Sequence, residues 1–262
     1  MVLTPGFHMR RKLVAGNWKL YGSLVANAQL LGELVSGGAG SGGAACAVLV
    51  PFPYLAQTQT LLQGSGIEWG AQTLAEYSSG AYTGEVAGSM LAEFGCTFVA
   101  VGHSERRALF HEDSATVARK VVAAAKAGLT PILCLGETLA EREAGNTRAV
   151  VQQQLEAVFE VAGMDLLAKS VVAYEPVWAI GTGKTASPDQ AQEVHAFIRG
   201  LVAKRDAEVA LGLPILYGGS VKAANAESLF AMPDVDGGLV GGASLVAKEF
   251  LDIWQAARRR VP

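Results

Sequence analysis

Charge is sparse in this sequence: 17% of the 262 residues are charged, the formal net charge is -3, and no basic run exceeds three residues. A nucleic-acid-binding domain normally carries a basic face, so that class is disfavoured, and we interpret the 258–260 arginine run as a solvated helix end. No apolar run approaches the roughly 18 residues that a membrane-spanning helix needs. The sequence therefore predicts no transmembrane helix and no nucleic-acid partner.

Cysteine and histidine are also scarce. The three cysteines, Cys46, Cys96 and Cys134, show no paired spacing, so we expect buried, reduced thiols and a cytoplasmic location. The four histidines are scattered, which predicts no metal-ligand cluster. The first residues lack the charged and long apolar regions of a secretory signal. We expect 1–8 to be a leader or an added extension outside the fold, and 9–262 to form one domain.

Short, continuous apolar runs recur along the chain, each ending in a polar or glycine-bearing turn. They occupy 13–17, 44–50, 67–72, 98–102, 131–136, 171–175, 215–218 and 238–241. Such runs indicate parallel strands covered on both faces, and helical patterns at 23–35, 114–126, 148–161 and 188–204 lie between them. Eight β/α units in roughly 250 residues favour a closed (β/α)8 TIM barrel of the α/β class over an open doubly wound sheet.

Polar and titratable groups gather where these predicted strands end, and the strand interiors carry almost none. The ends hold Asn17, Lys19, Gln72, His103, Glu105, Glu137, Glu175, Ser220, Gly241 and Gly242. In a (β/α)8 barrel, chemistry occurs at the C-terminal ends of the strands. The sequence therefore predicts a functional site at that rim.

Residues 173–186 are the most informative segment. They contain, in order, Glu175, Pro176, Trp178, Gly181 and Gly183. Ser187, Pro188 and Gln190 follow as the capping box and first position of a helix. The carboxylate at the strand end is predicted to be a general base. The segment after it, with its glycines and its fixed far end, is predicted to be a lid that excludes water from that base.

Three further motifs fit an anionic, phosphorylated substrate. Lys19 supplies a fixed positive charge at the rim. His103 lies where a strand meets a helix start, and the helix dipole there disfavours the imidazolium form. The glycine-bearing turns at 217–221 and 237–244 follow strands seven and eight, the usual phosphate site of such barrels.

These motifs, in this order, resemble the triosephosphate isomerase family from about residue 11 to residue 254: Gly-Asn-Trp-Lys at 16–19, Gly-His-Ser-Glu-Arg-Arg at 102–107, the 173–186 segment and Tyr-Gly-Gly-Ser at 217–220. The resemblance implies interconversion of dihydroxyacetone phosphate and D-glyceraldehyde 3-phosphate through an enediolate, without metal or organic cofactor. It also implies a place in glycolysis and gluconeogenesis.

The resemblance also implies a role for each site residue. Glu175 would be the base, His103 a neutral electrophile, and Lys19 with Asn17 the groups that stabilise developing charge, while Glu105 would hold Lys19 or the substrate in place. Asn17 and Lys19 would contact the substrate, and the backbone of Gly181, Ser220, Gly241 and Gly242 would contact its phosphate. The lid would span 176–186, including Pro176, Val177, Trp178, Lys184, Thr185 and Ala186.

A long loop without its own helix is expected at 70–86, and such loops normally have a function. The resemblance implies a homodimer in which Thr83 lies near Asn17 and Lys19 of the other chain; from the residues alone, a lid within one chain remains an alternative. Tyr21 stands where many family members carry asparagine, at a position facing that partner loop.

Other barrel functions fit the residues less well. An aldolase would need a lysine inside a central strand, and the predicted strands have none in their interiors. A metal-using epimerase would need histidine and acidic ligands on several strands, and these are also missing. The intact set of Glu175, His103 and Lys19 disfavours a non-catalytic barrel that serves as a binding protein.

Overall fold

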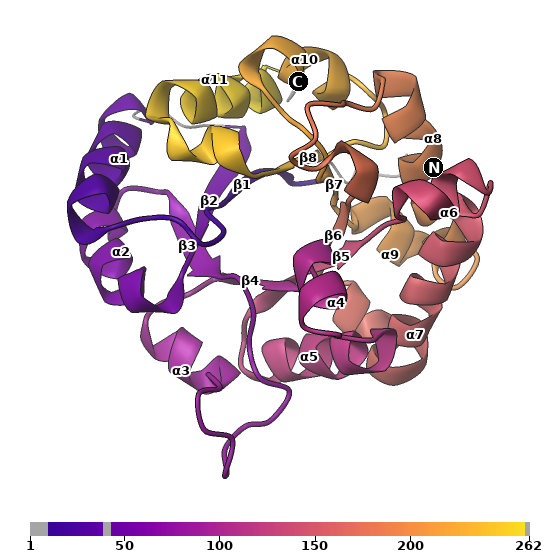
Figure 1. Cartoon of the computed structure of the whole chain (residues 1–262), viewed down its shortest axis with the longest axis horizontal. Coiled ribbons are helices and arrows are strands. Elements are labelled where there is room, and N and C mark those ends of the chain that lie inside the picture. The colour runs from indigo at the N-terminus through magenta and orange to yellow at the C-terminus, as the bar shows by residue number, and fades with distance from the viewer. Residues whose placement is uncertain (1–9, 39–42, 260–262) are drawn as a thin grey trace, which may run out of the picture.

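The structure, a computed structural model, describes residues 10–38 and 43–259. The expected extension 1–8 lies outside the described residues. Eight parallel strands pair in chain order and close into a barrel, β1 pairing with both β2 and β8, and helices surround it (Figure 1). The predicted (β/α)8 barrel is therefore confirmed, and the doubly wound alternative is excluded.

The strands lie within one or two residues of their predicted positions. They are β1 (Lys12–Asn17), β2 (Ala44–Val50), β3 (Glu68–Ala71), β4 (Phe98–Val101), β5 (Thr130–Leu135), β6 (Val171–Tyr174), β7 (Ile215–Tyr217) and β8 (Gly237–Val240). Most differences fall at the C-terminal ends, where residues such as Gln72, Glu175 and Gly241 have already left the ladder. Those residues lie in the loops and line the hollows at that end of the barrel.

Helices occupy most connections between strands. They are α1 (Leu24–Gly37), α2 (Leu55–Leu62), α3 (Gly88–Glu93), α4 (Ser104–Leu109), α5 (Ser114–Lys126), α6 (Leu139–Glu143), α7 (Thr147–Leu167), α8 (Pro188–Ala203), α9 (Ala207–Gly212), α10 (Ala223–Phe230) and α11 (Ala247–Arg258). The helix predicted at 148–161 extends further, as α7, and a kink at Gly163 with φ of 72° interrupts it. Glycine adopts this left-handed conformation without steric cost, and so allows a second helical turn to follow.

Local capping signals explain two helix starts. The predicted capping box of α8 is present, with Ser187 accepting from the Gln190 amide and the Gln190 side chain accepting from the Ser187 amide. The α5 helix begins after Asp113, whose carboxylate accepts from the Thr116 amide at 2.7 Å. Each cap satisfies a backbone donor that the first helical turn leaves free.

The hydrophobic core has two parts because successive strand residues point to opposite faces. A smaller cluster fills the barrel interior, including Leu13, Ala47, Phe98, Cys134 and Leu216, and a larger one lies between strands and helices. All three cysteines are buried and free, as predicted. Packed layers of this kind fill the barrel, so polar chemistry is confined to its ends.

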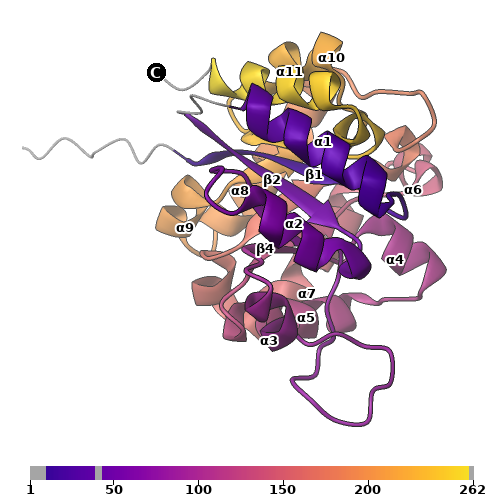
Figure 2. The same ribbon diagram turned by 90° about the vertical axis from the view of Figure 1, so that its left-hand side faces the viewer.

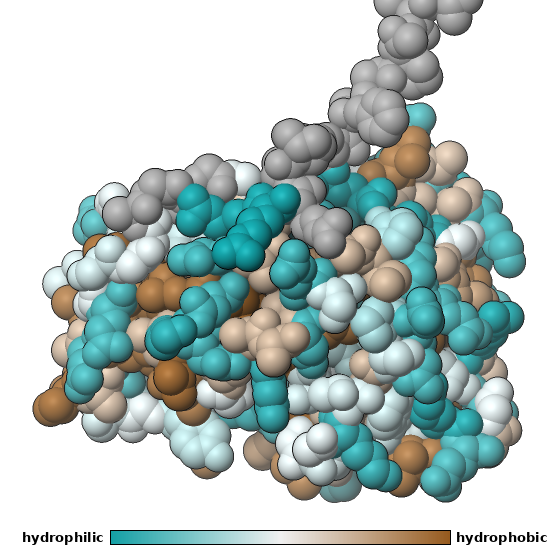
Figure 3. Space-filling view, turned by 90° about the horizontal axis from the view of Figure 1, so that it is seen from above, coloured by the Kyte–Doolittle hydropathy of each residue, from teal (hydrophilic) through white to brown (hydrophobic). Residues whose placement is uncertain are grey.

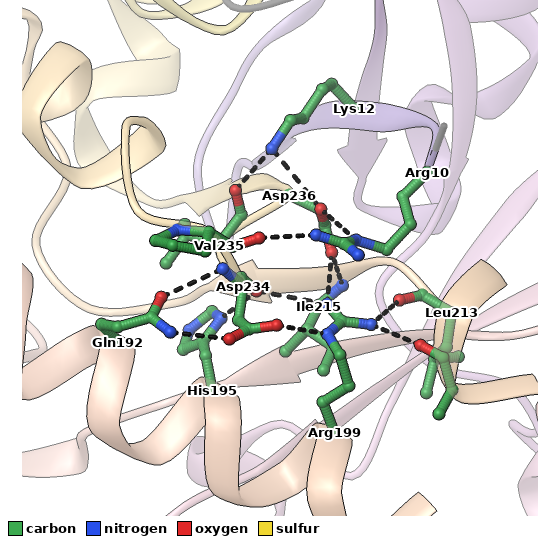
Figure 4. Close-up of polar contacts among 12 residues, drawn as sticks. Arg10, Lys12, Gln192, His195, Arg199, Leu213, Ile215, Asp234, Val235 and Asp236 are labelled. Carbon is green, nitrogen blue, oxygen red and sulfur yellow. Dashed lines mark hydrogen bonds and ion pairs between the residues drawn. The ribbon is translucent and has the colours of Figure 1, made fainter. Parts of the chain in front are cut away.

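A charged network closes the N-terminal end of the barrel (Figure 4). The buried carboxylate of Asp236, just before β8, lies 2.8 Å from Arg10 Nε and 2.8 Å from Arg199 Nη2, and accepts from the Ile215 amide at 3.0 Å. Arg199 also pairs with Asp234 at 2.6 Å. The network ties the starts of β1, β7 and β8 to helix α8, so it serves the stability of the barrel.

The surface has two features that the figures show. The loop at 72–87, between β3 and α3, has no helix and extends beyond the ring of helices (Figure 2). The face over α10 and α11 is mixed, with apolar side chains scattered among polar ones (Figure 3). Within the described ranges, no helix has the length and apolar character needed to cross a bilayer.

Candidate active site

A cavity of about 330 Å³ opens at the C-terminal ends of the strands. Its lining includes Asn17, Lys19, Tyr21, His103, Glu175, Ile180, Gly181, Gly218, Gly219, Ser220, Lys222, Gly241 and Gly242. The structure thus gathers the proposed catalytic and phosphate-contacting residues into one cavity, with the exception of Glu105. Glu105 lies beside it, in a neighbouring hollow that also contains Asn17, Lys19 and His103.

Glu175 follows β6 directly and is only 1% exposed. Its Oε2 accepts a 2.8 Å hydrogen bond from the Ser104 amide, and its Oε1 lies 3.0 Å from His103 Nε2. Burial raises the pKa of this carboxyl, but His103 and the Ser104 amide outweigh that effect, and the pKa lies below its ordinary value. In this arrangement Glu175 is a stabilised carboxylate.

Gly218 leaves room for that carboxylate. A Cβ atom at this position would lie 2.9 Å from Glu175 Cγ and 3.1 Å from the Tyr174 carbonyl oxygen. Real Cβ atoms essentially never come closer than 3.0 Å to another heavy atom. The glycine after β7 therefore positions Glu175 as well as forming part of the predicted phosphate turn.

His103 is the N-cap of α4, and its Nδ1 accepts a hydrogen bond from the Glu105 amide at 3.2 Å. An accepting Nδ1 carries no proton, so the proton of the neutral ring belongs on Nε2, toward Glu175. Burial lowers the pKa of the imidazole, but the Glu175 carboxylate and then Glu105 raise it by more. The pKa of the His103 imidazole is thus raised, whereas the helix dipole alone predicts that it is lowered. The negative charge of Glu175 explains why the prediction and the structure differ.

Lys19 is held in an uncommon backbone conformation, with φ of 54°. Its amide donates to Asn17 Oδ1 at 3.0 Å, its carbonyl accepts from Gln72 Nε2 at 2.8 Å, and its ammonium lies 2.5 Å from Glu105 Oε1. A left-handed non-glycine residue costs about 1–3 kcal/mol and persists only where its surroundings fix it. Asn17, Gln72 and Glu105 together fix the position of this cation.

The predicted lid begins with a single 3-10 turn, Val177–Ala179. Trp178 Nε1 donates to Glu137 Oε1 at 3.0 Å, and the Arg142 guanidinium lies 4.6 Å from the centre of the indole ring. At the far end the Ala186 amide donates to the Tyr217 hydroxyl at 3.3 Å. Ile180 and Gly181 line the cavity, whereas Lys184 and Thr185 are exposed and do not.

Glu137 makes the main contact in this site that the sequence did not predict, the one with Trp178. The sequence places Glu137 at the rim, but its fully buried carboxylate also accepts from the Tyr174 hydroxyl, at 3.1 Å, and pairs with Arg142. It therefore fastens the start of the lid to β5 and α6. No spacing signal links Glu137 to Trp178, because the two come together only when β5 and β6 pair.

In the part of the chain that the structure describes, no three His, Cys, Asp or Glu side chains come together as a metal site would need. Thr83 is exposed in the 72–87 loop, away from the cavity lining of its own chain. Its predicted proximity to a partner's Asn17 and Lys19 stays a prediction, as does the effect of Tyr21, which lines the cavity mouth.

Comparisons with known proteins identify the family of this chain. The triosephosphate isomerase family model matches residues 12–257. The triosephosphate isomerase of Thiobacillus denitrificans is 63% identical over 251 residues, covering 96% of this chain and 100% of the relative. That of Dechloromonas aromatica is 61% identical over 249 residues (95% and 100%), and that of Nitrosomonas europaea 57% over 249 residues (95% and 99%). The chain therefore belongs to the triosephosphate isomerase family and is an isomerase built on a (β/α)8 barrel.

Proposed function

We propose that this chain interconverts dihydroxyacetone phosphate and D-glyceraldehyde 3-phosphate, with Glu175 as the general base. The single observation that carries the proposal is the meeting of Glu175 and His103 at 3.0 Å on the wall of the cavity. A carboxylate and an imidazole on one wall can act on adjacent carbon and oxygen atoms of a small sugar. The relatives described above are named triosephosphate isomerases, which supports the same substrate class.

In the proposed reaction Glu175 removes a proton from the carbon beside the carbonyl and returns it to the neighbouring carbon. Its pKa is low in the present arrangement because His103 and the Ser104 amide stabilise the charge. Exchanging these contacts for substrate in a closed, dry cavity raises the pKa toward that of an effective base. The free site thus holds Glu175 as a stabilised carboxylate, and substrate binding makes that carboxylate more basic.

His103 donates from Nε2 to the developing enediolate oxygen as a neutral imidazole, and Lys19 with Asn17 stabilises the same charge. Support comes from the Glu105 amide, which occupies the lone pair of Nδ1. Once substrate separates His103 from Glu175, the main influence that raises the imidazole pKa is weakened. Glu105 holds the Lys19 ammonium in place.

The phosphate group is bound by the backbone of Gly181, Ser220, Gly241 and Gly242, all of which line the cavity. Gly181 belongs to the lid, so gripping the phosphate draws residues 176–186 shut. Binding energy from a group that does not react is thereby used to assemble the site.

The working assembly is a homodimer. Support comes from a hollow of about 420 Å³ beside the site, lined in part by Leu20, Leu109 and Phe110, whose side chains are exposed in the single chain. The 72–87 loop projects beyond the ring of helices, as a loop that reaches a second chain must (Figure 2), and Tyr77 stacks on Tyr82 within it, with ring centres 3.8 Å apart. Thr83 would then approach Asn17 and Lys19 of the partner.

With this activity the chain serves glycolysis and gluconeogenesis in the cytoplasm, consistent with three buried free thiols. A coupled isomerase assay on purified protein, run in both directions without added metal, tests the activity. Absence of turnover with either triose phosphate would refute it.

A further inference from the structure

Lys222 is a second lysine in the lining of the candidate site, and neither the resemblance nor the mechanism assigns it a role. It lines the same cavity as Ser220, Gly241 and Gly242, the residues proposed to contact phosphate. The other lysine of that lining, Lys19, is paired with Glu105 at 2.5 Å. Among residues 10–38 and 43–259, Lys222 forms no ion pair.

The charge balance of the site makes an unpaired cation significant. Glu105 neutralises Lys19, and Glu175 places one further carboxylate on the cavity wall. Without Lys222, these charges would leave an excess negative charge facing a ligand that is close to a dianion at neutral pH. The positive charge of Lys222, which lines the same cavity, offsets that excess.

The backbone that carries Lys222 is fixed from both sides. Asn225 Oδ1 accepts from the Lys222 amide at 2.8 Å, and Asn225 Nδ2 donates to the Ser220 carbonyl at 3.1 Å. The next amide, Ala223, donates to Glu249 Oε1 of α11 at 2.8 Å. Asn225 therefore holds the backbones of Ser220 and Lys222 together, so the Lys222 side chain extends from a fixed backbone position beside the proposed phosphate turn.

We propose that Lys222 is a binding residue for the substrate's phosphate dianion, adding to the backbone contacts a positive charge that favours the dianion over the monoanion. This inference rests on the proposed function. Because Lys222 is exposed, solvent and salt screen its charge, and its contribution is moderate and dependent on ionic strength.

The test compares K222Q, K222R and K222E with a matched control, K204Q, which removes one exposed lysine at the far end of α8. In low salt we expect K222Q to lower kcat/KM about three- to tenfold, mainly through KM, and K222E to lower it further. K222R should stay within about twofold of the parent, because it keeps the charge. The difference between K222Q and parent should shrink as salt rises.

Calorimetric titration with 2-phosphoglycolate separates this inference from the proposed function. Weaker binding to K222Q than to K204Q, with a shallower salt dependence, supports the role of Lys222 even if the parent shows no isomerase activity. If the parent is an active isomerase and K222Q matches K204Q in KM, affinity and salt dependence, the inference is wrong while the proposed function stands.

Discussion

His103 Nε2 and Glu175 Oε1 lie 3.0 Å apart, although the residues follow β4 and β6, two strands separated by β5. Each group shifts the titration of the other: the pKa of the imidazole is raised and that of the carboxyl is lowered. The free site therefore holds the proposed base and the proposed electrophile in mutual contact. In the proposed reaction the substrate replaces that contact.

Replacing Glu175 by Gln should lower kcat by about 10²- to 10⁴-fold, since the amide keeps the size of the side chain but cannot accept the proton. Steady-state kinetics in the coupled assay measures the loss. Glu160→Gln, an exposed change on α7, is the control and should leave kcat as it is. Turnover of the Glu175 variant at the parental rate would remove the base assignment.

Gly218→Ala should misplace the same carboxylate. The added methyl would lie 2.9 Å from Glu175 Cγ, so the side chain has to move, and displacements of about 1 Å can cost on the order of 10²-fold in rate. Gly200→Ala on α8 is the matched control, because a Cβ there meets no atom within 4 Å. Equal kcat values for the two variants would show that Gly218 does not position the base.

Stability should fall with acidification because of His195, which is fully buried on α8 and has its pKa lowered from 6.5 to about 4, chiefly by burial. Between these values the unfolded chain binds a proton that the folded chain does not, so the free energy of unfolding decreases as pH falls. The full shift corresponds to about 3 kcal/mol.

Urea unfolding at pH 7 and pH 4.5 measures this effect in the parent and in His195→Gln, whose amide can still donate to the Asp234 carbonyl that His195 Nδ1 contacts at 3.1 Å. The variant should lose less stability over that interval. An identical pH dependence in the two proteins would assign the acid sensitivity to other groups.

Deleting residues 76–82 should give monomers with weak activity, because the proposed partner contact through the projecting loop is lost. Analytical ultracentrifugation and the coupled assay measure the two effects together. The loop lies outside the ring of helices, so the barrel should keep its fold by circular dichroism. A deletion protein that stays dimeric and fully active would contradict the interlocking role.

The local pattern of the sequence was sufficient to predict much of the fold. Continuous apolar runs predicted all eight strands, and Ser187 with Gln190 predicted the start of α8, because strand burial and helix caps depend on neighbouring residues. The position of polar residues at strand ends also predicted the rim where they gather, and seven of those ten residues line the cavity there, all but Gln72, Glu105 and Glu137. Parallel strands bring their C-terminal ends to one rim, so that inference needs only the fold class.

Only the tertiary structure decided how these groups act on one another. The direction of the His103 pKa shift depends on Glu175, the attachment of Trp178 depends on Glu137, and the position of the Lys19 ammonium depends on Glu105. Each of these contacts joins different β/α units. Burial and charge pairing are set by distances across the closed barrel, and the order of residues along the chain does not contain those distances.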